Sequence, residues 1–261
     1  MPPRDAERHL ATERHGAGER VVLVHGFTQT GASMWALARH LEAHFEVVTL
    51  DLPFHGRRPR FAASLEDAAA MVGENCGAAN YLGYSLGGRV CLTLALEHPE
   101  LVRRLVLVGA TPGIADAAER LARRQDDEAL AARLRAGGTS PEALEGFLAQ
   151  WLAGPLFSHL SAEQADLASR RANATDRLAD ALQYLGTGTQ VPSYGRLGKL
   201  DMPVLLLAGA RDAKFSAIAK QMGDLIGVNA NRALIAGSGH AAPFEAPETV
   251  AAVVREFLER P

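Results

Sequence analysis

Lysine is nearly absent from this chain of 261 residues. Only three of its 27 basic residues are lysines, and the other 24 are arginines. Biased codon usage in a GC-rich genome accounts for such a composition. A sharper interpretation is that some arginines bind carboxylates, because the planar guanidinium matches a carboxylate with two parallel hydrogen bonds. Residues 111–195 hold eight arginines, as uniform scatter would give, so only position can indicate function.

Excess positive charge is lacking as well. The 30 acidic residues outnumber the basic ones, and the net charge is −3. A general nucleic-acid binder usually carries a basic surface and a high pI, so we expect no nucleic-acid partner. The sequence shows no heptad repeat, and it leaves the oligomeric state open.

Cysteines and long apolar runs are scarce. The two cysteines, Cys76 and Cys91, fall in or beside expected helices, which favours buried free thiols in a reducing compartment over a disulfide. No run of 18 apolar residues occurs, and residues 1–20 lack the apolar core of a signal peptide. The sequence therefore predicts a cytoplasmic protein without a membrane span.

Common cofactor patterns are missing too. The spacing of His and Cys residues matches no zinc site. No G-x-G-x-x-G follows an expected strand, and no P-loop lysine is present. We therefore expect neither a metal nor a cofactor.

Short apolar runs alternate with amphipathic stretches along most of the chain. The runs are almost continuously apolar, which is typical of parallel strands covered on both faces. We expect strands at residues 20–25, 45–50, 79–84, 104–109, 203–208 and 232–236. We expect helices at residues 34–42, 65–72, 86–97, 217–226 and 247–258. This alternation predicts an α/β fold with a mostly parallel sheet flanked by helices. A preceding hairpin around His9 to Thr12 has only a weak signal.

The alternation breaks between Thr111 and Leu200. This stretch has no convincing strand, but it has two helix starts. Pro141 follows Ser140 at a first helical position, and Ser161 to Gln164 fit a capping box. We expect residues 1–110 and 201–261 to form the core, and residues 111–200 to form an inserted helical cap, a lid over the carboxyl edge of the sheet.

The strongest motif is Gly83-Tyr84-Ser85-Leu86-Gly87-Gly88. It fits G-x-S-x-G and lies between an expected strand and an expected helix, which is the context of a nucleophile elbow. Such a turn exposes the serine hydroxyl at a helix N-terminus, where the helix dipole favours developing negative charge. A chance Gly/Ser turn is the alternative, and the flanking elements disfavour it.

A serine hydroxyl needs a histidine to take its proton and a carboxylate to orient that histidine. His240 follows the last expected strand, and Asp212 follows the strand before it. The order Ser, acid, His is that of α/β-hydrolases. We therefore predict that Ser85, Asp212 and His240 form a catalytic triad. The alternatives are a surface histidine at His240 and a simple helix N-cap at Asp212.

An oxyanion hole needs two backbone N–H groups aimed at one point. We expect one from Leu86, directly after the nucleophile. We expect the other from Phe27, in the loop after the first long strand, where Gly26 permits the turn. For His25 in the same loop, a structural role is favoured over chemistry.

These elements resemble the α/β-hydrolase superfamily over nearly the whole chain. A narrower resemblance is to the 2-succinyl-6-hydroxy-2,4-cyclohexadiene-1-carboxylate (SHCHC) synthases. The elbow pentad is common to the superfamily, whereas the residues that follow it and the acid loop are more specific. The resemblance rests on Arg89 after the elbow, Pro112-Gly113 with Arg120, Arg123 and Gln125, Gln150-Trp151 through Pro155-Leu156-Phe157, and Arg211-Asp212-Ala213-Lys214-Phe215.

This resemblance implies a carbon–oxygen lyase of menaquinone biosynthesis rather than an ester hydrolase. Such enzymes remove a proton from a cyclohexene ring and expel pyruvate from an enolpyruvyl ether. Ser85 activated by His240 would be the base, and Asp212 would orient His240. Phe27 and Leu86 would stabilise the charge that spreads onto the succinyl ketone oxygen. The expected partner is a small anionic substrate with three carboxylates.

The resemblance also implies cationic and aromatic substrate-binding residues. Arg89 lies one helical turn past Ser85, and Arg123 matches a cap arginine that faces the substrate. Arg171 is our choice for a third arginine, and the neighbouring Arg170 remains an open alternative. Each arginine could instead form an ordinary ion pair. Tyr84 and Trp151 are candidate pocket walls, with a core role as the alternative.

Two departures from the family pattern bear on the substrate. Phe54 stands where glycine is common, and residues 241–245 are less polar than is usual after the histidine. The alternative function is therefore a serine hydrolase of the same superfamily, acting on esters or C–C bonds of small carboxylate-bearing substrates. The intact triad disfavours a non-catalytic receptor.

Overall fold

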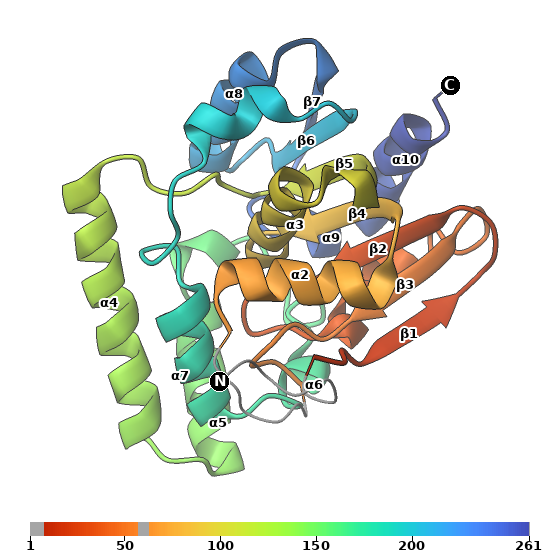
Figure 1. Ribbon diagram of the computed structural model, residues 1–261. Helices are drawn as coiled ribbons and strands as arrows, with labels where there is room; N and C mark the ends of the chain where they lie inside the picture. The colour runs from red at the N-terminus through yellow and green to blue at the C-terminus, as the bar shows by residue number, and fades with distance from the viewer. Residues whose placement is uncertain (1–7, 57–62, 261) are drawn as a thin grey trace.

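Seven strands form a single sheet in the computed structural model, which describes residues 8–56 and 63–260 (Figure 1). The order in the sheet is β1-β3-β2-β4-β5-β6-β7. The strands are β1 (Thr12–His15), β2 (Arg20–Val24), β3 (Glu46–Leu50), β4 (Ala79–Tyr84), β5 (Val102–Val108), β6 (Val204–Gly209) and β7 (Ala230–Ile235). All neighbours pair in parallel except β1 and β3, which are antiparallel. Of the hairpin weakly indicated around His9 to Thr12, the described residues show only β1, which pairs with β3, and the chain before residue 8 lies outside the described residues.

The mostly parallel α/β sheet expected from the sequence is confirmed. Along β2, Val22 and Val24 face one hydrophobic cluster while Val21 and Leu23 face another, so both faces of the sheet are buried. One cluster packs under α2 (Leu65–Cys76), α3 (Leu86–Glu97) and α8 (Ala213–Ile226). The other packs under α1 (Trp35–Ala38), α9 (Ala242–Glu245) and α10 (Pro247–Leu258). Two-sided burial explains why the strands read as continuous apolar runs.

Three helix boundaries differ by four residues from those expected. The helix α2 continues to Cys76, beyond the expected end at residue 72. The helix α1 stops at Ala38, and turns replace the rest of the stretch expected to be helical up to residue 42. The helix α8 begins four residues early, because the Asp212 carboxylate accepts a hydrogen bond from the Phe215 N–H and caps its first turn.

The described chain between β5 and β6 contains helices and no strand. These helices are α4 (Ala117–Ala136), α5 (Pro141–Leu152), α6 (Leu167–Arg170) and α7 (Thr175–Leu185). The longer ones share a small hydrophobic cluster of their own, and Figure 1 shows them grouped apart from the helices that cover the sheet. None of the helices in the described ranges is long and apolar enough to span a membrane.

The two expected helix starts in this stretch have different outcomes. Ser140 caps α5 by accepting a hydrogen bond from the Ala143 N–H. Ser161 and Gln164 make both bonds of a capping box, yet only a turn follows. The helix α6 begins later, after Asp166, whose left-handed backbone (φ 48°, ψ 54°) separates it from that turn. Correct capping chemistry therefore did not suffice to start a helix.

Asn80 is a buried polar exception within β4. Its side chain is fully buried, and neither its amide nitrogen nor its oxygen has a hydrogen-bond partner among the described residues. Burying an unpaired amide costs about 1–3 kcal/mol.

Replacing this amide with an apolar β-branched side chain should stabilise the fold. We expect Asn80→Val to raise the free energy of unfolding by about 1 kcal/mol, because the unpaired groups disappear and valine suits a strand. Urea denaturation at neutral pH measures the change, and the slope against denaturant should stay the same. A loss of stability would contradict the assignment of an unpaired amide.

Candidate active site

Ser85 occupies the sharp turn between β4 and α3. Its backbone has φ 52° and ψ −108°, a conformation that L-residues rarely adopt. The chain around it leaves no room for side chains. A Cβ on Gly83 would lie 2.3 Å from the Gly87 carbonyl oxygen, and one on Gly87 would lie 2.1 Å from the Val24 carbonyl oxygen. The Ser85 N–H also donates to the Val108 carbonyl at 2.9 Å, which ties the turn to β5.

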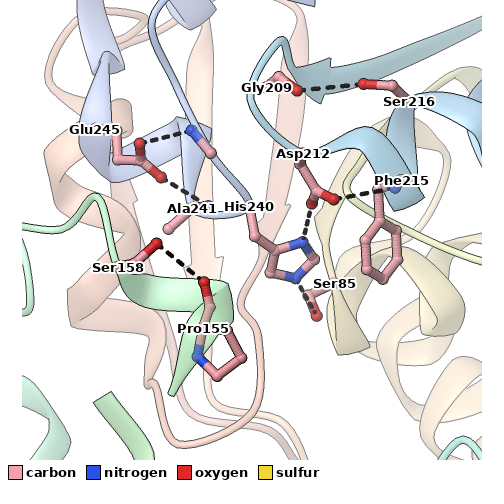
Figure 2. A network of polar contacts seen from close by, with 11 residues as sticks. Ser85, Pro155, Ser158, Gly209, Asp212, Phe215, Ser216, His240, Ala241 and Glu245 are labelled. Carbon is pink, nitrogen blue, oxygen red and sulfur yellow. Dashed lines mark hydrogen bonds and ion pairs between the residues drawn. The ribbon is translucent and has the colours of Figure 1, made fainter. Parts of the chain in front are cut away.

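His240 lies between Ser85 and Asp212 and contacts both (Figure 2). Its Nε2 is 3.3 Å from Ser85 Oγ, and its Nδ1 is 2.8 Å from Asp212 Oδ2. The other Asp212 oxygen accepts from the Phe215 N–H at 3.1 Å. Burial alone would raise the pKa of Asp212, but these hydrogen bonds outweigh it and hold that pKa below its usual value. A charged Asp212 fixes the ring so that Nε2 can accept the serine proton.

The carboxyl ends of parallel strands bring these residues to one edge of the sheet. Ser85 follows β4, Asp212 follows β6, and His240 comes from the loop after β7. The imidazole packs against Phe215 with ring centroids 4.4 Å apart, and against Tyr84 at 5.5 Å. The structure therefore brings together all three residues predicted as the triad.

The loop after β2 carries Phe27, and it is anchored from several sides. Gln29 binds the Gly26 N–H at 2.9 Å. Asn173, just after α6, donates to the Thr28 carbonyl at 2.8 Å and accepts from the Gly56 N–H at 2.9 Å. Asn173 thus joins the loops after β2 and β3 to the helical stretch. Phe27 and Leu86, the predicted oxyanion residues, line the same cavity as Ser85.

Two buried histidines, His25 and His55, pack beside this loop. His25 Nδ1 donates to the Gly26 carbonyl, and its Nε2 accepts from the Leu52 N–H, so the ring must be neutral. Burial lowers the pKa of His25 to about 4. His55, whose Nδ1 donates to the Pro53 carbonyl, packs edge-on against His25, and burial lowers its pKa to about 3. Both rings hold backbone in place.

Three arginines line the cavity around Ser85, namely Arg89, Arg123 and Arg170. Arg89 is buried and donates to the Leu185 carbonyl at 2.6 Å and to Gln190 Oε1 at 3.3 Å. Burial lowers the pKa of Arg89 to about 10, so it stays charged at neutral pH.

Arg170 is 2% exposed and donates to the Ala165 carbonyl and the Thr28 hydroxyl. Burial lowers its pKa as well. Neither Arg89 nor Arg170 forms an ion pair with a carboxylate in the described parts of the chain. The cavity therefore holds two buried positive charges that neutral groups alone position.

Arg171, our choice for the third arginine, does not line the cavity around Ser85. Arg171 is exposed and pairs with Glu145 at 2.9 Å on the outer surface, while Arg170 points into the cavity. Successive residues of a helix project about 100° apart, so a shift of one position exchanges the inner and outer faces. Arg123 does line the cavity, but it is 41% exposed and already paired with Asp127 at 2.9 Å.

Both predicted wall residues, Tyr84 and Trp151, line the cavity. Tyr84 is buried, and burial raises its pKa. Trp151 packs edge-on against Phe27 with ring centroids 5.1 Å apart. Its buried indole N–H has no hydrogen-bond partner among the described residues. A residue of the cavity wall thus keeps an unpaired donor.

Two positioning contacts were missed from the sequence. Asn173 carried no signal, because the two loops that it joins are more than 100 residues away. Glu245 accepts hydrogen bonds from the backbone on both sides of His240. Its only signal was a glutamate shortly after the histidine, at the start of a helix.

Residues 19–247 match the family model of the α/β hydrolase fold. The chain belongs to this family. It is 30% identical to the putative SHCHC synthase of Bacillus subtilis, covering 95% of this chain and 93% of that one. It is 33% identical to the SHCHC synthase of Klebsiella pneumoniae subsp. pneumoniae over 91% of this chain and 93% of the relative.

Solved structures agree with the fold. MenH from S. aureus superposes with a TM-score of 0.86 at 28% identity, covering 96% of this chain and 98% of that one. A thermophilic esterase from Thermogutta terrifontis gives a TM-score of 0.77 at 23% identity over 95% and 92% of the two chains. The resemblance to the α/β-hydrolase superfamily and to the SHCHC synthases is therefore confirmed. Within residues 8–56 and 63–260, no cluster of His, Cys, Asp or Glu side chains could hold a metal ion.

The two neutral histidines should make the fold sensitive to acid. The unfolded chain binds their protons near the ordinary histidine pKa of about 6.5, whereas the folded chain resists protonation down to about 4 for His25 and about 3 for His55. Stability should therefore fall as the pH drops below about 6.5, by up to about 1.4 kcal/mol per pH unit for each histidine.

The variant His55→Asn separates this effect from other titrations. An asparagine amide can still donate to the Pro53 carbonyl but does not titrate in this range. We expect its unfolding free energy, measured in urea at pH 8.5, 7.5, 6, 5.5 and 5, to fall less steeply below about pH 6.5 than that of the wild type. Above pH 7.5 the two slopes should agree, and identical slopes below pH 6 would contradict the buried neutral state of His55.

Proposed function

We propose that this protein is an SHCHC synthase, a carbon–oxygen lyase of menaquinone biosynthesis that eliminates pyruvate from an enolpyruvyl cyclohexene carboxylate. One observation carries the proposal: a Ser-His-Asp arrangement shares its cavity with two buried arginines that have no carboxylate partner within residues 8–56 and 63–260. An enzyme for neutral esters has no need of such charges. The names of the full-length relatives support the same activity.

The reaction begins with removal of a ring proton by Ser85. His240 Nε2 draws the hydroxyl proton, and Asp212 stabilises the imidazolium that forms. The electron pair of the broken C–H bond becomes a ring double bond, and the C–O bond to the enolpyruvyl group breaks. The expelled enolpyruvate takes up a proton and tautomerises to pyruvate. The 3.3 Å between Ser85 Oγ and His240 Nε2 fits a resting site whose catalytic hydrogen bond shortens on substrate binding.

The backbone N–H groups of Phe27 and Leu86 stabilise the negative charge that builds on the succinyl ketone oxygen. Their value lies in being fixed before the reaction, because donors that need not reorganise stabilise charge most effectively. The anchoring of the Phe27 loop by Gln29 and Asn173 supports this role.

Arg89, Arg123 and Arg170 bind the carboxylates of the substrate. Bonds between arginine and carboxylate are stronger than neutral hydrogen bonds, and in a buried cavity they also offset the cost of an unpaired charge. Trp151 supplies one further donor, and Tyr84 forms part of the wall.

Residues 111–200 act as a cap over a core formed by residues 1–110 and 201–261. The composition of the cavity wall supports this division, since Ser85 and His240 come from the core while Arg123, Trp151 and Arg170 come from the helical stretch. The free, buried thiols of Cys76 and Cys91 support a reducing, cytoplasmic location.

A serine hydrolase acting on small carboxylate-bearing esters or diketones is the second candidate. The observation that favours it is the strained elbow, which presents Ser85 as a nucleophile as well as a base. The two candidates share every residue of the triad and differ in which bond breaks.

A panel assay distinguishes the two reactions. We expect the purified protein to release pyruvate from the enolpyruvyl tricarboxylate, followed with lactate dehydrogenase, and to turn over p-nitrophenyl esters slowly or not at all. Ser85→Ala should lower kcat about 1,000-fold or more. Fast ester turnover without pyruvate would refute the lyase function.

The neighbouring arginines Arg170 and Arg171 give a matched test of carboxylate binding. We expect Arg170→Ala to lower kcat/KM for the tricarboxylate by about tenfold or more, since a charge-assisted bond contributes about 1.5–3 kcal/mol. Arg171→Ala removes the same charge from the outer surface and should stay within about twofold. Thermal melts check that both variants fold. Equal effects of the two substitutions would contradict the assignment of Arg170.

Arg89→Lys extends the test to geometry. It retains the charge but cannot make two parallel bonds to a carboxylate, so we expect it to be impaired on the same substrate. A neutral p-nitrophenyl ester, where it reacts at all, should be turned over equally by Arg89→Lys and the wild type.

A further inference from the structure

Glu245 accepts hydrogen bonds from the backbone on both sides of His240 but does not line the cavity around Ser85. Its Oε2 accepts the Gly239 N–H at 2.7 Å, and its Oε1 accepts the Ala241 N–H at 3.0 Å (Figure 2). It is not among the residues that line the cavity around Ser85. Figure 2 shows the carboxylate on the far side of this loop from Ser85. Glu245 therefore contacts the backbone of the histidine loop and not the reacting groups.

Gly239 leaves room for the Glu245 carboxylate beside the histidine loop. A Cβ on Gly239 would lie 3.3 Å from Glu245 Oε1 and 2.7 Å from His159 Cδ2, so a larger residue there would crowd the contact. Upstream, the Arg211 N–H donates to the Ser238 carbonyl at 2.8 Å, which ties the histidine loop to the loop of Asp212. Glu245 in turn holds the Ser238–Gly239 peptide unit before His240 and the His240–Ala241 peptide unit after it.

Helix capping explains only half of this contact. Ala241 is the N-cap of the short helix α9, and a glutamate near a helix start often reaches back to the N-cap N–H. Gly239 lies outside the helix, and its N–H is the closer of the two partners. The second bond has no role in starting α9.

We propose that Glu245 is a positioning residue that sets the place of His240 relative to Ser85. Asp212 fixes one ring nitrogen, but a ring hydrogen bond alone leaves the backbone of His240 free to move within its glycine-containing loop. With both flanking N–H groups held by one carboxylate, the backbone becomes the fixed end and the ring projects toward Ser85. Proton transfer is sensitive to such placement, and a shift of about 1 Å can cost about 100-fold in rate.

A matched pair of glutamates tests the proposal in the full-length protein. Glu245→Gln keeps the size but replaces one acceptor oxygen with an NH₂ that faces a backbone N–H. We expect kcat for pyruvate release to fall about tenfold or more, with KM within about twofold, because substrate contacts are untouched. Glu248→Gln removes the same charge from an exposed site in the first turn of α10 and should retain wild-type kcat.

A double-substitution cycle separates positioning from a merely structural role. In a His240→Ala background, Glu245→Gln should lower kcat no further, because no imidazole remains to be placed. The same fractional loss in both backgrounds would overturn the proposal. If Glu245→Gln does not fold, Glu245→Asp provides the same readouts, since it keeps the charge but is one methylene too short to hold both N–H groups.

The lyase readout rests on the proposed function, so a second readout is independent of it. The rate at which a fluorophosphonate probe labels Ser85 depends on activation by His240 and not on the tricarboxylate. We expect labelling of Glu245→Gln to be about tenfold slower than that of the wild type and of Glu248→Gln. Normal labelling of Glu245→Gln would refute the role of Glu245, whereas a wild type that is labelled but releases no pyruvate would refute only the lyase function.

Discussion

The backbone of Ser85 keeps its strained conformation because the surrounding chain has no room to relax. Gly83 and Gly87 approach neighbouring backbone too closely for any Cβ, and the Ser85 N–H is tied to β5. The strain is thus held by the packing of β2, β4 and β5 rather than by the turn itself. The other groups of the site depend on the same sheet, because Asp212 and His240 follow β6 and β7 at the same edge. Strand register therefore decides whether the three side chains meet.

The buried histidines and the buried arginines of this site need opposite charge states. Beside the Phe27 loop, His25 must stay neutral so that its Nε2 can accept the Leu52 N–H, and burial keeps the neighbouring His55 neutral. Above Ser85, Arg89 and Arg170 stay charged although burial disfavours the charge. The folding of the chain has already removed water from these two guanidinium groups. An incoming carboxylate then meets donors whose desolvation cost belongs to the protein's stability and not to the binding step.

The parts of this molecule that could be predicted from the sequence depend on local pattern. The buried strands, the elbow and the order Ser85, Asp212, His240 each follow from a strand, a turn and the residue just beyond. The strand β1 has mostly half-buried or exposed positions and so lacks a hydrophobic pattern. The sequence could not tell whether Arg170 or Arg171 faces the cavity. The helix α6 is a single turn, and Asp166 and the contact with Thr28 set which of its sides faces inward. Asn173 acts through partners 117 and 145 residues away, and no local pattern encodes such contacts.

The side-chain amide of Asn173 also limits how the helical stretch of this protein can be exchanged by protein engineering. Exchanging the helical stretch for that of another hydrolase is an attractive route to new specificity, since the stretch has its own small core. Yet the Asn173 side chain is a structural element of the loops after β2 and β3, which belong to the other part of the chain. A transplanted stretch must bring an equivalent amide to the same place, or the recipient loses the support of its Phe27 loop. Asn173 therefore belongs to the structure of both parts, and neither part can be exchanged without regard to it.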